Sequence, residues 1–243
     1  MSDRFSRTAL LVGTEGLACL ADCRVLAAGI GGVGSYAVEA LARAGIGQLT
    51  LVDGDTIHPS NINRQLHALT STIGQPKVAV MAERLQQINP DLQLTPLQML
   101  VTPENVADLL APGYDLVLDA IDTFSAKLAL LQRCVECQLP VISSMGAAGK
   151  LDPTRVAIAD IGESQGCRLA RKLRKQLRRQ GIEQGITVVY SDEPCRDGRF
   201  GEAEKDTTDT RRALGSISFL PGTFGLFMAA EAIRLLLAEK MRC

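Results

Sequence analysis

A glycine-rich segment near the N-terminus has the residue types and spacing of a phosphate-binding loop. Residues 29–34 read GIGGVG, so Gly29, Gly31 and Gly34 form the pattern G-x-G-x-x-G. Asp53 follows nineteen residues after Gly34, where dinucleotide-binding proteins carry the acid that binds a ribose hydroxyl. The pattern predicts a nucleotide with its phosphates at a helix N-terminus, and NAD is the first nucleotide that it suggests.

Cations beyond Asp53 favour a triphosphate over NAD. Asp53 begins the stretch DGDTIHPSNINRQ, which contains Arg64, and Lys77 ends the following GQPK. A nicotinamide is neutral, whereas two cations near a helix N-terminus could neutralise the charge that develops as a phosphoanhydride bond breaks. The additional Gly32 would let the backbone close on phosphates. Solvated loop charges are the alternative interpretation of Arg64 and Lys77.

Strands and helices alternate around these residues as far as residue 150. Apolar runs predict strands within 23–31, 48–55, 93–101, 114–122 and 139–149, and helix-forming segments occupy 35–45, 76–88 and 123–138. Gly45 is suited to end the first of these helices. Such alternation predicts an α/β fold with a doubly wound, Rossmann-like, mostly parallel sheet.

The pattern changes after residue 150. Strands are expected at 155–162 and 186–193 around a basic helix at 167–181, a polar mobile loop at 195–212 and a final helix at 221–240. We therefore expect one domain over 1–243: a nucleotide-binding core (1–150) with a C-terminal strand and helix extension (151–243) that binds substrate and forms a dimer. The core has 10 Lys and Arg against 14 Asp and Glu, and the extension 16 against 13, so an anionic partner is expected on the extension.

Composition favours a cytoplasmic protein without a membrane segment. The chain has 243 residues, of which 46% are hydrophobic and 22% charged, and no apolar run reaches the roughly 20 residues of a membrane helix. The N-terminus lacks the pattern of a signal peptide. Seven cysteines, an odd number without regular spacing, suit a reducing compartment.

Five motifs occur in an order that resembles the adenylating core of the MoeB/ThiF superfamily, to which ubiquitin-activating enzymes also belong. They are RFSR (4–7), GIGGVG (29–34), DGDTIHPSNINRQ (53–65), GQPK (74–77) and DAIDTFSAK (119–127). The resemblance implies that ATP, not NAD, occupies the glycine loop, with Asp53 on the ribose. It implies that Arg7 reaches the partner's site in a homodimer, and that Asp122 engages Mg²⁺ or the phosphates. Capping of the following helix is the alternative role for Asp122.

The site residues that this resemblance implies form two overlapping sets. Its catalytic residues would be Arg7, Arg64, Lys77 and Asp122. Its ATP-binding residues would be Gly29, Gly31, Gly32, Gly34, Asp53, Asp55, Ser60, Asn61, Asn63, Arg64, Gln65, Lys77, Asp122 and Thr123. A carboxylate is a poor electrophile, and joining it to AMP makes it attackable, so such a site must hold two anionic reactants in line.

The cysteines argue against the plain sulfur-carrier activators of this superfamily, which usually hold zinc with two C-x-x-C pairs. This chain has one such pair, Cys134 and Cys137, and no second pair to complete a tetrahedral zinc site. Both lie in a predicted helix and are interpreted as core residues. Cys195, in the expected mobile loop, is a candidate nucleophile of the kind found in ubiquitin-activating enzymes.

The segment CRLARKLRKQLRRQG is the most distinctive part of the extension. Its leucines Leu169, Leu173 and Leu177 recur every four residues as the face that packs down. Seven cations and no acid share the opposite side, which is typical of a surface that binds a phosphate backbone. They are Arg168, Arg171, Lys172, Arg174, Lys175, Arg178 and Arg179. A solvated charged helix is the alternative.

Together, the ordered motifs, the absence of paired zinc cysteines and the basic helix resemble the tRNA threonylcarbamoyladenosine dehydratases, the TcdA (CsdL) family. That resemblance implies ATP-dependent cyclisation of threonylcarbamoyladenosine in tRNA through a carboxyl adenylate. It implies tRNA as partner and ATP and Mg²⁺ as cofactors, and adds a monovalent cation and a sulfur-transfer protein as further candidates. The alternatives are an adenylating activator of a small ubiquitin-like or sulfur-carrier protein, and a nucleotide-binding protein without adenylation activity.

Overall fold

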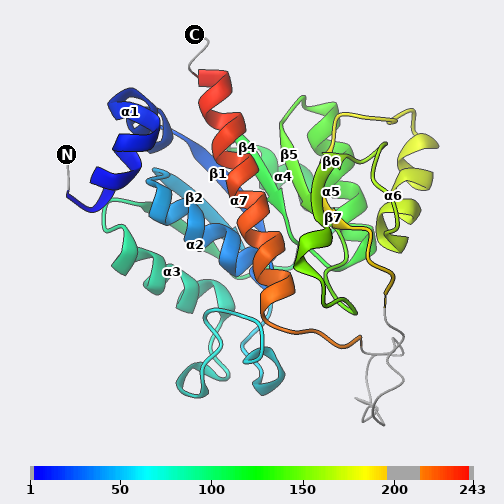
Figure 1. The fold of residues 1–243 in the computed structure, drawn as a ribbon, viewed down its shortest axis with the longest axis horizontal. Helices are drawn as coiled ribbons and strands as arrows, with labels where there is room; N and C mark the ends of the chain where they lie inside the picture. Colours follow the sequence, from blue (N-terminus) through cyan, green and yellow to red (C-terminus); the bar gives the residue numbers. More distant parts are fainter. Residues whose placement is uncertain (1–2, 196–213, 241–243) are drawn as a thin grey trace.

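A seven-stranded sheet forms the centre of the molecule (Figure 1). The structure is a computed structural model that describes residues 3–195 and 214–240. The strands are β1 (Arg24–Ala28), β2 (Gln48–Val52), β3 (Gln93–Leu97), β4 (Leu116–Asp119), β5 (Val141–Ser144), β6 (Val156–Asp160) and β7 (Thr187–Ser191). The helices are α1 (Ser6–Ala21), α2 (Gly34–Ala44), α3 (Lys77–Ile88), α4 (Val106–Leu110), α5 (Phe124–Glu136), α6 (Arg168–Arg178) and α7 (Phe219–Lys240). Short 3-10 turns occupy Asp3–Phe5, Pro59–Asn61, Thr70–Thr72 and Pro153–Arg155.

The strand order, β3-β2-β1-β4-β5-β7-β6, reverses direction between β1 and β4. All neighbouring strands are parallel except β6, which runs antiparallel to β7. The carboxyl ends of β1, β2 and β4 meet at one edge, because Ala28 is in register with both Val52 and Asp119. The predicted mostly parallel, doubly wound α/β fold is confirmed, and this reversal is where such sheets bind ligands.

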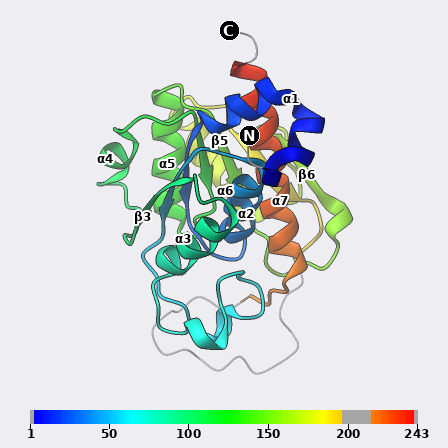
Figure 2. The ribbon, with the colours of Figure 1, turned by 90° about the vertical axis from the view of Figure 1, so that its left-hand side faces the viewer.

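Helices cover both faces of the sheet, as Figures 1 and 2 show. One apolar cluster joins the sheet to α1, α2, α3 and α7, and includes Leu20, Leu41, Met81 and Phe224. The other joins the sheet to α4, α5 and α6, and includes Leu130 and Leu173. The two layers hold the glycine-loop helix α2 on one face and the basic helix α6 on the other.

The C-terminal helix α7 is apolar over most of its length. Its segment Phe219–Ala238 is long and apolar enough to cross a membrane, although 56% of the apolar window is buried inside the protein. It lies directly against α2, where a Cβ on Gly225 would stand 2.4 Å from the carbonyl oxygen of Val33. The apolar character of α7 thus serves packing in the core.

Helices α1 and α4 lie where no element was predicted. Gly13 interrupts α1 with a φ of 75°, and Leu10 and Leu11 are 82% and 87% exposed, so α1 lacks a single apolar stripe facing the core.

Gly45 ends α2 in the left-handed conformation, as predicted. The mobile loop expected at 195–212 falls almost wholly in residues 196–213, outside the described part of the chain.

Candidate nucleotide site

A pocket of about 930 Å³ lies at the carboxyl ends of the central strands. It contains every residue of the implied ATP-binding set except Gly34, which begins α2 directly beneath the loop. The lining residues from that set are Gly29, Gly31, Gly32, Asp53, Asp55, Ser60, Asn61, Asn63, Arg64, Gln65, Lys77, Asp122 and Thr123. Segments separated by almost one hundred residues in the sequence therefore share one cavity.

The glycines of the loop serve different purposes. Gly29 has a φ of 90°, and a Cβ there would lie 2.6 Å from the carbonyl oxygen of Ala120; a Cβ on Gly34 would lie 1.8 Å from that of Gly29. The fold itself requires these two glycines. A Cβ on Gly31 would meet only Gln65 Nε2, at 3.8 Å. The backbone at Gly31 is therefore open to a ligand in the pocket.

Gly32 makes room for two other segments of the chain. A Cβ at this position would approach Pro221 Cβ to 3.2 Å and Arg64 Cγ to 3.3 Å. The sequence interpretation, that Gly32 lets the backbone close on phosphates, is therefore incomplete, because Gly32 also lets the loop pack under Arg64 and the start of α7.

Asp53 at the end of β2 holds the glycine loop in place. Its Oδ2 accepts a 2.7 Å hydrogen bond from the Ile30 amide and its Oδ1 a 2.9 Å bond from the Asp55 amide. Burial raises the pKa of this carboxyl, against the opposing effects of Lys77 and the two backbone donors. A carboxylate has about four lone-pair positions, so Asp53 retains capacity for the hydroxyls of a ribose.

Lys77 and Arg64 differ in how their charge is balanced. Lys77 Nζ is 2.6 Å from Asp55 Oδ2 and 3.8 Å from Asp53 Oδ1. Arg64 donates from Nη1 to the Ser60 carbonyl and to Asn63 Oδ1, both at 2.8 Å. Within the described ranges no carboxylate forms an ion pair with Arg64, so its positive charge is available to an anion in the pocket.

Asp122 lines the same pocket from the turn between β4 and α5. The N-cap residue of α5 is Thr123, and no side chain forms a capping hydrogen bond there, so the alternative role of Asp122 as a helix cap has no support. Asp122 is exposed to the pocket, and in the described part of the chain its only side-chain partner is Thr123 Oγ1, at 3.5 Å. A free carboxylate oxygen beside a cavity suits Mg²⁺, which proteins often bind through one or two carboxylates together with substrate phosphates.

Three further segments of the pocket lining were missed by sequence reasoning. Residues 99–101 after β3 form one and residues 144–148, from the last residue of β5 onward, form another, while Leu214, Ser216 and Pro221 before and within α7 form the third. Asn63 Nδ2 donates to the Ser216 carbonyl at 3.0 Å and links this wall to the implied ATP-binding segment. These residues carry no motif, and only the fold brings them to the site.

Arg7 is remote from the pocket of its own chain. Phe5, two residues before it, packs near Gly45 at the carboxyl end of α2, whereas the glycine loop is at the other end of that helix. Eleven helical residues span about 16 Å. Arg7 is exposed on α1, so any role in this kind of site requires a second copy of the chain.

The basic helix α6 contributes one residue to the pocket wall. Leu169 in its first turn lines the cavity, while Ala170, Leu173 and Leu177 are buried beneath it. Six of its predicted cations are exposed: Arg168, Arg171, Lys172, Lys175, Arg178 and Arg179.

Arg174 corrects the prediction of seven free cations on one side of α6. This side chain is half-buried, and its Nη1 donates to the carbonyl of Ile161, at 3.2 Å, and to the carbonyl and hydroxyl of Ser164. Lys172 also has a local contact, with its Nζ 4.1 Å from the centre of the Phe124 ring. Arg174 therefore holds the turn between β6 and α6 and contributes little to an open cationic surface.

The two cysteines of the C-x-x-C pair differ in environment. Cys134 is buried, and burial raises the pKa of its thiol to about 12. Cys137 is exposed at the end of α5, so its interpretation as a core residue was wrong. Across residues 3–195 and 214–240, no cluster of three His, Cys, Asp or Glu side chains could hold a metal ion. Cys195 is half-buried, with Sγ 3.9 Å from the carbonyl oxygen of Ala148 beside the pocket.

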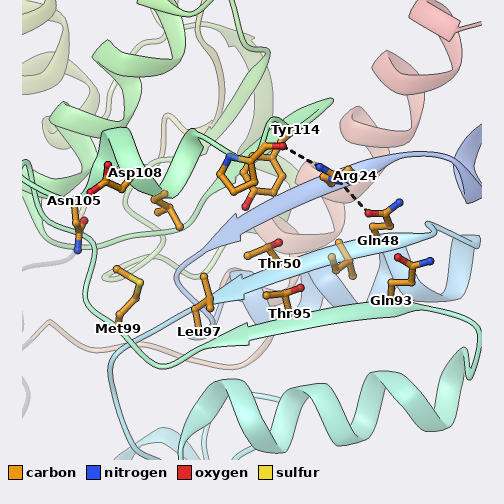
Figure 3. Close-up of a pocket in the computed structure, with 13 residues that line it drawn as sticks. Arg24, Gln48, Thr50, Gln93, Thr95, Leu97, Met99, Asn105, Asp108 and Tyr114 are labelled. Carbon is orange, nitrogen blue, oxygen red and sulfur yellow. Dashed lines mark hydrogen bonds between the residues drawn. The ribbon is translucent and has the colours of Figure 1, made fainter.

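A second hollow of about 590 Å³ lies over β1, β2 and β3 (Figure 3). Its lining mixes neutral polar side chains such as Thr50 and Thr95 with Leu97, Met99 and Tyr114. Arg24, at one end, already donates to Gln48 and to the Pro112 carbonyl. This hollow lacks the glycine loop and the free cation of the first pocket, which is therefore the candidate functional site.

Comparison with known proteins identifies the family. The ThiF family pattern matches residues 5–242. The chain belongs to the ThiF family. Among ThiF-family relatives, the tRNA threonylcarbamoyladenosine dehydratase of Bacillus subtilis is 42% identical over 98% of this chain and 96% of its own length. The corresponding Escherichia coli enzyme is 37% identical over 98% of this chain and 95% of its own.

A solved ThiF-family structure has the same arrangement over its whole length. The E. coli tRNA N6-threonylcarbamoyladenosine dehydratase TcdA, in complex with ATP, matches with a TM-score of 0.90 and 36% identity, covering 99% of this chain and 98% of that one. The same enzyme in complex with AMP matches with a TM-score of 0.89. The resemblance inferred from the five motifs is confirmed.

Proposed function

We propose that this chain is an ATP-dependent tRNA threonylcarbamoyladenosine dehydratase that acts by carboxylate adenylation. Full-length similarity to dehydratases whose structure holds ATP and AMP supports this proposal. The observation that carries it is a single pocket lined by an unpaired cation, Arg64, by an exposed carboxylate, Asp122, and by a glycine loop at a helix N-terminus. This arrangement suits a polyphosphate with its metal ion.

The reaction has two steps. A carboxylate oxygen of the threonyl group attacks the α-phosphorus of ATP, an O–P bond forms, and the bond from that phosphorus to the bridging oxygen breaks, so pyrophosphate leaves. The carbamoyl group then attacks the activated carbonyl carbon and loses one N–H proton to solvent, and the C–O bond to AMP breaks. The sum is cyclised nucleoside, AMP and pyrophosphate.

The chain's own residues account for the electrostatics of the first step. Arg64 neutralises charge on the departing pyrophosphate, and Lys77 can move from Asp55 to a phosphate oxygen. The backbone at Gly31 binds the phosphates closely, and Asp53 accepts hydrogen bonds from the ribose. Asp122 is the residue that would hold Mg²⁺, and the ion, when bound, would supply further neutralisation of the phosphate charge.

The basic helix α6 is the proposed surface for tRNA. Its exposed cations continue outward from the pocket wall at Leu169. A modified nucleoside in the pocket therefore leaves its neighbouring phosphates near Arg168 and Lys172. The residues of α6 form a phosphate-binding face, and the fit of the nucleoside in the pocket provides the specificity.

We also propose a homodimer in which α1 crosses to the partner. Leu10 and Leu11 lie three and four residues after Arg7, on its side of the helix, and both are more than four-fifths exposed. Covering this apolar patch would deliver Arg7 to the partner's pocket. In this proposal residues 1–150 bind the nucleotide and 151–243 bind substrate and complete the dimer, in the cytoplasm. A monovalent cation and a sulfur-transfer partner stay predictions of the resemblance.

The experiment measures AMP and pyrophosphate from ATP and tRNA that carries threonylcarbamoyladenosine. The wild-type protein should release both in equal amounts with cyclised nucleoside, and Asp122→Asn should lose at least about 100-fold in kcat while keeping its melting temperature. A protein that adenylates a ubiquitin-like carrier and leaves the tRNA unchanged would establish the alternative function.

A separate measurement tests the tRNA surface. Replacing Arg171, Lys175 and Arg178 by Ala should lower tRNA affinity and reduce the slope of log K against log salt by up to roughly 2 to 3, because each phosphate contact contributes about 0.7 in a single strand and about 0.9 in a duplex. ATP affinity should not change. Arg174→Ala is the matched control, which should lower the melting temperature with little effect on the salt slope. Equal slopes for the triple variant and the wild-type protein would exclude α6 as the tRNA surface.

A further inference from the structure

A buried ion pair joins two walls of the nucleotide pocket. Lys127 and Asp119 are both fully buried, and Lys127 Nζ is 2.6 Å from Asp119 Oδ2. The ammonium also donates to Ser143 Oγ at 3.2 Å and to the Ser144 carbonyl at 3.0 Å. The three N–H donors of the ammonium thus have three acceptors within the protein. The ammonium group needs no partner from the cavity.

The residues that contact this ion pair lie at the ends of β4 and β5, where the segments that line the pocket begin. Asp119 is the last residue of β4, and its other oxygen, Oδ1, accepts the Ile121 amide at 3.1 Å, one residue before Asp122. Ser143 in β5 is in register with Asp119 and donates to its Oδ2 at 2.6 Å. Ser144 is the first pocket residue of the β5 wall.

Lys127 connects a third element to the same point. It lies in the first turn of α5, where its amide donates to the Thr123 carbonyl at 3.0 Å. The side chain and the backbone of Lys127 therefore fix both ends of the turn that carries Asp122 and Thr123. The glycine loop also rests on this turn, because Gly29 packs directly on Ala120.

Maintaining such a pair is costly unless it has a purpose beyond stability. Removing two charges from water carries a desolvation penalty that their attraction often fails to exceed, and an apolar replacement is frequently as stable. The chain nevertheless places this pair beneath the turn that presents Asp122. A saturated network with one geometry is well suited to hold a turn within the narrow tolerance that a reacting site needs.

We propose that Asp119, Lys127 and Ser143 form a positioning unit for the adenylation step. The unit sets the separation between the Asp122 turn and the β5 wall, and so keeps the two walls in the positions at which ATP meets the attacking carboxylate. None of its side chains touches the ligands. This inference rests on the proposed function, because it assigns the unit to that reaction.

The test uses a variant that loosens the unit without leaving a buried charge unpaired. Ser143→Ala removes two hydrogen bonds and keeps the ion pair. Its matched control is Ser191→Ala, a fully buried serine at the end of the neighbouring strand β7 whose hydroxyl accepts only the Glu193 amide in the described structure. ATP affinity, kcat for pyrophosphate release and melting temperature are measured for both on the full chain.

The expected result is a separation of kcat from binding. Ser143→Ala should lower kcat about tenfold and leave the Kd for ATP within about twofold, because misalignment affects the reacting geometry more than the bound ground state. Ser191→Ala should lower the melting temperature by less, because it removes one neutral hydrogen bond instead of two charge-assisted ones, and it should keep the wild-type kcat. A Ser143→Ala enzyme with the kcat of Ser191→Ala would overturn the proposal.

A second variant covers the pair itself. Lys127→Met alone would leave Asp119 charged and buried, so the double variant Asp119→Asn with Lys127→Met is used, which keeps an acceptor for the Ile121 amide. It should fold, bind ATP and lose about 100-fold in kcat. A double variant with wild-type kcat would also overturn the proposal. Failure of the wild-type protein to release pyrophosphate would instead reject the proposed function.

Discussion

Replacement of Gly31 by alanine separates what the fold requires from what the nucleotide requires. A Cβ at residue 31 would have one neighbour, Gln65 Nε2 at 3.8 Å, which is an ordinary van der Waals distance. The free energy of unfolding should therefore change by no more than about 0.5 kcal/mol. The added methyl group would project into the cavity, where we propose that the backbone approaches the phosphates of ATP.

The magnitude of the ATP effect follows from the loss of one charge-assisted hydrogen bond. Such a bond contributes about 1.5 to 3 kcal/mol, which corresponds to a rise in Kd of roughly 10- to 150-fold. Calorimetric titration with ATP measures the Kd, and scanning calorimetry measures the stability of the same sample. We expect weaker binding with an unchanged melting temperature.

Two other glycines serve as controls for the Gly31 variant. Gly29→Ala forces a φ of 90° on alanine and brings its Cβ to 2.6 Å from the Ala120 carbonyl oxygen, so it should lose more than about 1 kcal/mol of stability. Gly113→Ala has a φ of 77° in open space and reports the cost of the backbone conformation alone. If Gly31→Ala binds ATP like the wild-type protein, the phosphates do not approach this loop and the proposed binding mode is wrong.

Two further predictions concern buried groups outside the pocket. His67 is 2% exposed, and burial, with the nearby charges of Lys77 and Arg84, lowers its pKa to about 4. Between about pH 6.5 and 4 the unfolded chain therefore binds more protons than the folded chain. Up to about 3 kcal/mol of folding stability, present above pH 6.5, should be lost as the pH falls through this range. His67→Phe should flatten the melting temperature between pH 7.5 and 5, and an unchanged pH dependence would contradict this assignment. Alkylation of the native protein at pH 8 should modify the exposed Cys137 and spare Cys134, whose thiol has a pKa of about 12; rapid labelling of Cys134 in mass spectrometry would contradict the described packing.

The sequence predicted best those features that depend on local pattern. The strand before Gly29, the left-handed Gly45 at the end of α2 and the alternation up to residue 150 follow from apolar period and turn chemistry. Helix α1 was missed because Gly13 and exposed leucines break its pattern. The extension was predicted in its elements, but not that β6 would be antiparallel at the edge of the same sheet.

Features of the site that depend on long-range contacts could not be predicted from the sequence. Arg174 looks like its neighbours in LARKLRKQLRR, and only the position of the Ser164 turn shows that it is occupied. The wall of Leu214, Ser216 and Pro221 reaches the pocket because α7 packs beside α2. Lys127 belongs to the motif DAIDTFSAK, yet its contact with both Asp119 and Ser143 depends on the register that places Ser143 beside Asp119.

The balance of charge in the described structure separates positioning groups from groups that meet ligands. Asp119 and Lys127 satisfy each other completely within the core, and Lys77 lies between two acids at the edge of the cavity. Arg64 and Asp122 are the ionised groups of the described pocket that lack an oppositely charged partner, and they come from separate segments of its lining. An unpaired charge beside a cavity keeps its full attraction for an incoming ion. A nucleotide with its metal ion carries both signs of charge, and it would complete the two partnerships that the protein leaves open.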